Sequence, residues 1–106
     1  MPKYLLQASY SGEGSKGLLK DGGTKRVKAA RTLVESLGGK LEAMYFAFGD
    51  TDVVAFVDMP DNASAAAASL TISGSGALTG KITVLLTPED IDQAARKSPT
   101  YTAPGR

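Results

Sequence analysis

The feature that most constrains this chain is a pair of apolar runs, residues 41–48 and 53–59, joined by the short polar segment 49–52. Short apolar runs separated by a few Gly and Asp residues are typical of two strands in a hairpin. Both runs carry large apolar side chains at alternate and at consecutive positions, so both faces of the hairpin need cover. A chain of 106 residues has helix enough for one face only. The other face is predicted to meet a partner subunit or a ligand.

Local patterns predict the remaining elements. Apolar residues at alternate positions indicate strands, and apolar residues three and four positions apart indicate helices. Thr24, Asp61 and Thr87 stand where a residue would cap a following helix. The expected order is a strand over 3–10, an irregular glycine-rich loop with room for one helical turn over 11–23, a helix over 24–37, the hairpin strands, an alanine-rich helix over 63–72, a loop over 73–80, a strand over 81–86 and a helix over 88–97.

This order predicts an α+β fold of the ferredoxin-like type, β-α-β-β-α-β with a C-terminal helix. The domain is expected over residues 1–97, with a tail over 98–106. Right-handed crossovers place both helices on one face of a four-stranded antiparallel sheet. The connection after the first strand, the hairpin turn and the loop over 73–80 then meet at one end. A site is expected there.

Composition excludes much of the familiar chemistry. The chain has no Cys and no His, so thiol nucleophiles, imidazole bases, zinc ribbons, iron–sulfur clusters and haem ligation by His or Cys are ruled out. No catalytic residue, metal site or cofactor is predicted. A net charge of +1 disfavours nucleic acid, and no apolar stretch approaches the roughly 20 residues that span a bilayer. No leader pattern precedes the first strand, so a cytoplasmic location is expected.

Basic residues crowd the first turns of the helix over 24–37. They are Lys25, Arg26, Lys28 and Arg31. Basic side chains interact unfavourably with the positive end of the helix dipole at its N-terminus. Residues that break such a local preference without an evident gain in stability are often part of a functional site. Arg26 is the odd one, because it falls within the apolar stripe. With Lys20 it could hold a carboxylate or phosphate, or it could simply pair with an acid while the lysines stay solvated.

Asp50 and Asp52 flank the hairpin turn at the end expected to hold Arg26. Turns favour Asp on local grounds alone. A structural pair with Arg26, a metal-binding carboxylate pair and a general base all remain open.

Aromatic side chains concentrate on the predicted strands. They are Tyr4, Tyr10, Tyr45, Phe46, Phe48 and Phe56. They fit a helix-facing core or a subunit interface. They also fit a cavity between two sheets, in which Gln7, Ser9 and a tyrosine hydroxyl such as that of Tyr45 would orient a small apolar ligand.

Four segments of the chain carry a family resemblance; they are residues 2–7, 17–23, 48–54 and 58–61. On these segments the chain resembles the GYD domain family of small bacterial proteins, and the resemblance covers nearly all of residues 1–97. In the namesake motif, Gly49 and Asp52 match while Thr51 replaces the tyrosine, so no role of a tyrosine hydroxyl carries over. The resemblance implies a dimeric α+β barrel, in which two such sheets pack face to face, and it implies no established activity.

These observations predict a small homodimer that is joined through its sheet face. It would bind a small molecule or act as an accessory or interaction module. The alternative is a cofactor-independent enzyme, similar to the monooxygenases and isomerases among dimeric α+β barrels. Binding is favoured, since no acid–base constellation can be defended without His or Cys.

Overall fold

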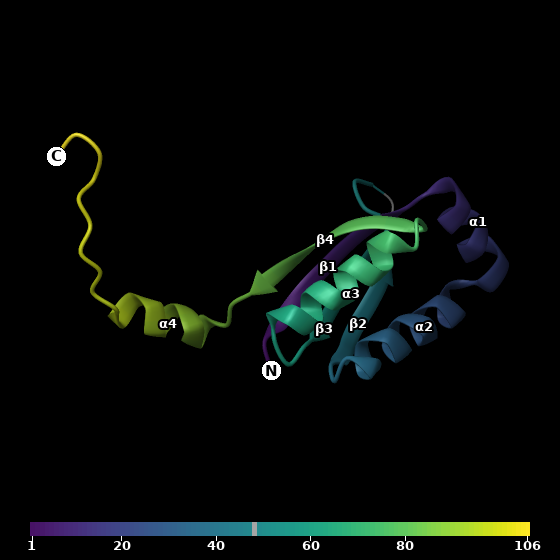
Figure 1. The fold of residues 1–106 in the computed structure, drawn as a ribbon, viewed down its shortest axis with the longest axis horizontal. Coiled ribbons are helices and arrows are strands. Elements are labelled where there is room, and N and C mark those ends of the chain that lie inside the picture. Colours follow the sequence, from purple (N-terminus) through teal and green to yellow (C-terminus); the bar gives the residue numbers. More distant parts are fainter. Residues whose placement is uncertain (48) are drawn as a thin grey trace.

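The computed structural model describes residues 1–47 and 49–106. Within these ranges four strands form one antiparallel sheet in the order β2-β3-β1-β4, and helices cover one of its faces (Figure 1). The elements are β1 (Lys3–Tyr10), α1 (Gly12–Asp21), α2 (Gly23–Ser36), β2 (Lys40–Phe46), β3 (Val53–Asp58), α3 (Asn62–Gly74), β4 (Leu78–Leu85) and α4 (Pro88–Arg96). The predicted ferredoxin-like α+β fold is confirmed.

The strand register separates the two faces of the sheet. Tyr4 pairs with Val57 on β3 and with Val84 on β4. Alternate residues of β1 and β3 point to the helices and are largely buried, whereas those between them form an open face. A bulge after Leu41 leaves Glu42 as an extra residue, because Leu41 pairs with Val57 while Ala43 pairs with Phe56.

The core lies between the sheet and the helices α2 and α3. Its buried apolar residues are Tyr4, Ala8, Val34, Leu41, Val53, Ala55, Val57, Met59, Ala65 and Ala68. The small side chains of α3 let this helix approach the sheet closely. The buried Tyr4 hydroxyl is satisfied, since it donates to Asn62 Oδ1 at 2.5 Å.

The prediction of a loop over residues 11–23 is wrong, because α1 occupies most of it. Ser11 caps this helix, and its hydroxyl accepts a hydrogen bond from Gly14 N at 3.0 Å. Gly14 is buried, and a Cβ there would lie 2.0 Å from the backbone oxygen of Ala77. Glycine here permits close packing rather than a turn. Gly22, at φ +80°, separates α1 from α2 and takes the capping position expected for Thr24.

The connection before β4 is also shorter than the predicted loop over 73–80. Helix α3 continues to Gly74 and β4 begins at Leu78, which pairs with Tyr10. Gly80 therefore lies inside a strand. A Cβ at this position would come within 2.6 Å of Gln7 O, so the glycine reflects a close backbone approach.

The helix caps of α3 and α4 follow the sequence prediction. Asp61 accepts a hydrogen bond from Ser64 N at 2.8 Å, and this bond lowers the pKa of Asp61. Thr87 and Asp90 form a reciprocal capping box, with Pro88 in the first turn. Both helices begin where local chemistry places them.

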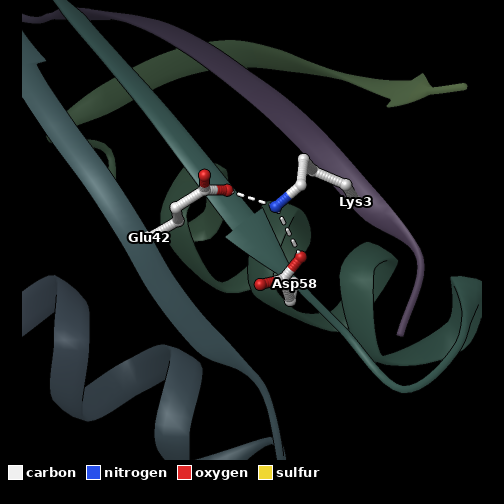
Figure 2. A network of polar contacts seen from close by, with 3 residues as sticks. All are labelled: Lys3, Glu42 and Asp58. Atoms are coloured by element: carbon white, nitrogen blue, oxygen red, sulfur yellow. Dashed lines mark hydrogen bonds and ion pairs between the residues drawn. The ribbon is translucent and has the colours of Figure 1, made fainter. Parts of the chain in front are cut away.

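One ion network joins three strands on the open face. Lys3 of β1 lies between Glu42 of β2 and Asp58 of β3, with 2.8 Å between Lys3 Nζ and Asp58 Oδ1 (Figure 2). Hydrogen bonds to Asp58 and then to Glu42 raise the pKa of Lys3. Because these side chains are partly exposed, the network contributes little to stability.

The C-terminal segment extends away from the sheet. Helix α4 and the residues after it project beyond the end of β4 (Figure 1). The Cα radius of gyration is 17.1 Å, against about 13 Å for a compact chain of similar length. Among the described residues no helix has the length and apolar character needed to cross a bilayer.

Candidate functional site

A cavity of about 130 Å³ lies between the sheet and the two crossover helices. Helix α2 packs mainly on β2 and α3 on β4, so they cover opposite halves of the sheet and leave space between them. The small residues Ala29, Ala30 and Ala68 line this space from the helices, and Leu6 and Met44 line it from the sheet.

Polar side chains reach the cavity at a few points of its otherwise apolar wall. They are Tyr10, Arg26 and Ser69. Arg26 lies in the first turn of α2 on the stripe that faces the sheet, and 36% of its side chain is exposed. The sequence prediction that Arg26 occupies the apolar stripe is confirmed. Its side chain therefore extends from the apolar interior towards the solvent.

The acidic neighbour of Arg26 is Asp21, at the end of α1. Arg26 Nη1 lies 3.7 Å from Asp21 Oδ2, which is an ion pair but too long for a hydrogen bond. Lys25 Nζ is also 3.7 Å from Asp21, so this carboxylate faces two cations. The expected pair of Arg26 with Asp50 or Asp52 is not formed, because the unpredicted helix α1 brings Asp21 to the start of α2.

Tyr10 lies beside Arg26 on the sheet side. Burial raises the pKa of the Tyr10 phenol, and the nearby Arg26 guanidinium acts in the opposite direction. The hydroxyl therefore stays protonated at neutral pH and can donate a hydrogen bond.

The two hairpin-turn aspartates have different surroundings. The Asp52 carboxylate accepts a hydrogen bond from Tyr10 N at 2.9 Å, and Asp52 N donates to Ala8 O at 2.9 Å. Asp52 thus anchors the turn to β1. Asp50 is exposed, and its backbone oxygen accepts from Ser9 Oγ at 3.3 Å.

The remaining predicted site residues lie apart from the cavity. Gln7 and Tyr45 are on the open face of the sheet, where the side chain of Tyr45 is 64% exposed. Lys20 is exposed in the last turn of α1. The ligand-binding roles of all six predicted residues remain predictions, and the structure distributes them over the cavity, the open face and the loop end. Phe48 lies outside the described residues.

The connection after β1, the hairpin turn and the connection before β4 meet at one end of the sheet, as predicted. Ser11 N donates to Ala77 O at 2.8 Å, and the hairpin turn is bonded to β1 through Asp52. Sequence reasoning missed the cavity beside this end. The available signal was the coincidence of small residues on both helices, such as Ala30 and Ala68, with one arginine on the same face.

Sheet order, helix placement and caps define a ferredoxin-like α+β protein with a cavity on its helix side. A family model described as the GYD domain matches residues 4–95. The chain therefore belongs to the GYD domain family, as its motifs suggested. No curated protein and no solved structure matches the chain significantly.

Proposed function

We propose that this protein binds a small apolar carboxylate in the cavity between α2, α3 and the sheet. The supporting observation is an apolar space of about 130 Å³ with Arg26 at its wall. Apolar walls with a few oriented polar groups are characteristic of small-molecule sites. An apolar protein cavity of about 150 Å³ accommodates benzene, so the ligand body is about the size of one aromatic ring.

Arg26 and Tyr10 supply the recognition of the charged group. A guanidinium presents paired donors that match both oxygens of a carboxylate. The separation of 3.7 Å from Asp21 leaves those donors loosely engaged. The protonated Tyr10 hydroxyl beside it adds a further donor. Together they fix the carboxylate while the apolar body fills the interior.

The lining of the cavity favours binding over proton-transfer catalysis. Its titratable side chains among the described residues are Tyr10, whose pKa is raised by burial, and Arg26, and neither is a carboxylate or an imidazole. A general base at the reacting atom needs a deprotonated group at the operating pH. The chemistry available here is recognition of an anion.

The proposal predicts that benzoate and hexanoate raise the melting temperature with concentration, whereas benzyl alcohol and hexanol do so much less. A ligand that binds only the native state stabilises it by mass action. Arg26→Ala should weaken benzoate binding about 10- to 100-fold, since a hydrogen bond to a charged group contributes roughly 1.5–3 kcal/mol. Isothermal titration calorimetry measures this directly.

Arg31→Ala is the matched control, because Arg31 is exposed on the same helix and does not line the cavity. It should leave benzoate binding unchanged. Equal benzoate affinities for Arg26→Ala and Arg31→Ala would overturn the assignment of Arg26, and no stabilisation by any carboxylate would overturn the function.

We also infer that the protein is a homodimer joined through its open sheet face. The apolar residues Leu5, Val54 and Phe56 occupy this face together with Tyr45, and no helix of the described chain covers them. An apolar patch on both copies can bury itself in an isologous interface.

Val54→Asp is expected to convert the dimer to a monomer. Val54 points away from the helices and pairs with Gln7 and Tyr45, so a charge there would be buried between subunits without a partner. Light scattering should give twice the 11.0 kDa chain mass for the wild type and one chain mass for the variant. Thr71→Asp on the exposed side of α3 should remain dimeric. A monomeric wild type would end the proposal.

A further inference from the structure

The C-terminal arm, residues 86–106, contains the helix α4 and has little cover from its own chain. Every residue from 86 to 102 is exposed, including Leu86, Ile91 and Tyr101. Helix α4 has nine residues, and isolated helices shorter than about 12 residues are marginal in water even with good caps. The capping box fixes where α4 starts, but its stability requires a surface to dock on.

The chemistry of α4 specifies that surface. Ile91, Ala94 and Ala95 share one face at helical spacing, and the side chain of Ile91 is 53% exposed. Acidic residues surround this face in the first half of the helix; they are Glu89, Asp90 and Asp92. The complementary surface is an apolar groove with a basic rim.

Such a groove runs along α2 at the β2 edge of the sheet. Its lining includes Val27 and Phe46, with Lys28 and Arg31 also in the wall. Phe46 is 40% exposed and packs against Gly23, where a Cβ would lie 3.2 Å from the ring. The groove extends along α2 to Glu35, about 18 Å, and α4 is about 14 Å long. Length and apolar lining match, and Lys28 and Arg31 offer basic charge to the acidic residues of α4, whereas Glu35 lies at the end of the groove.

The arm cannot reach this groove in its own chain. Strands β4 and β2 are opposite edges of the sheet, about 14 Å apart at the usual strand spacing. Only Leu86 and Thr87 separate β4 from α4, and two residues span about 7 Å. The helix α3 also packs on β4, between the arm and α2. A second copy can present its groove at the β4 edge, where the width of the sheet and α3 do not intervene.

We propose that α4 of one copy docks in the α2 groove of a second copy, in a reciprocal exchange of arms. If two open sheet faces stack about a twofold axis parallel to the strands, β4 of each copy lies across from β2 of the other. Leu85 and Lys40 are at the same end of the sheet through the pairings of Lys3 and Asp58, so α4 leaves near the Glu35 end of the partner groove. This inference rests on the sheet-face homodimer proposed above and does not depend on the cavity ligand.

Site-directed disulfide formation tests the docking, because the natural chain has no cysteine. Ile91→Cys and Thr32→Cys are made in separate full-length chains, which are mixed and allowed to exchange subunits before oxidation. Both positions are exposed or at the groove, so both variants should fold. The mixed disulfide should form at least about 100-fold faster than that of Ile91→Cys with Thr71→Cys on α3, because docking replaces micromolar by about millimolar effective concentration.

Charge reversal provides an independent test of the same docking. Lys28→Glu with Arg31→Glu should slow the mixed disulfide, and adding Glu89→Lys with Asp92→Lys on the arm should restore its rate. Circular dichroism confirms folding of each variant. Equal rates for the Thr32 and Thr71 partners, or no response to charge reversal, would overturn the proposal. A single chain that carries both Ile91→Cys and Thr32→Cys should not form the disulfide internally at high dilution; internal formation would overturn the intermolecular docking.

Discussion

Replacing Gly14 by alanine is expected to lower the free energy of unfolding by about 3 kcal/mol, at the upper end of the usual cost of overpacking. The added Cβ would lie 2.0 Å from Ala77 O and 3.0 Å from the Tyr10 ring. Since the obstacle is backbone, α1 itself must move. That shift disturbs the bonds from Ser11 N and Ser11 Oγ to Ala77 O. Thermal unfolding should show a melting temperature lower by about 10–20 °C.

Gly17→Ala is the matched control within the same helix. No atom lies within 4 Å of a Cβ at Gly17, and alanine has the higher helix propensity by about 0.5–1 kcal/mol. The two substitutions should therefore change stability in opposite directions. If both stabilise the protein, residues 12–21 do not pack against the start of β4 as described.

Met59→Ala is expected to cost about 2–5 kcal/mol of unfolding free energy, the range for truncating a fully buried methionine. Met59 is 0% exposed and follows β3, where its backbone N–H donates to Pro2 O at 3.0 Å. Its side chain also lines the cavity. Truncation removes apolar contacts and enlarges a space that is already present, so little relaxation can compensate. Chemical denaturation with urea measures the loss.

Leu70→Ala on α3 is the control for this effect. Leu70 is 73% exposed, so its truncation should change stability by less than about 0.5 kcal/mol. The enlarged cavity of the Met59 variant should also accept naphthoate better, relative to benzoate, than the wild type does. A cost below about 1 kcal/mol for Met59→Ala would mean that the helices close over the cavity, which contradicts its role as a preformed site.

Arg26 illustrates how far sequence reasoning reached into the candidate site. Its position within the apolar stripe of a helix could be predicted, because helical periodicity alone places residue 26 beside Leu33. Its acidic neighbour could not. The predicted partners were Asp50 and Asp52, whereas Asp21 is the ion-pair partner. The pairing with Asp21 depends on α1, which was predicted as a loop because the segment contains Gly12, Gly14 and Gly17.

The order of the four strands and of helices α2, α3 and α4, the ferredoxin-like plan, the caps of α3 and α4 and the absence of imidazole and thiol chemistry were determined by the sequence alone. Periodicity and capping act between residues a few positions apart. The capping interactions of Asp61 with Ser64 and of Thr87 with Asp90 can therefore be predicted without a structure. Only the tertiary structure decided that residues 12–21 are helical, that a cavity lies beneath Arg26 and that α4 projects from the domain. Each of these depends on how distant segments meet. The packing of Gly14 on Ala77 is such a contact, and no local pattern encodes it.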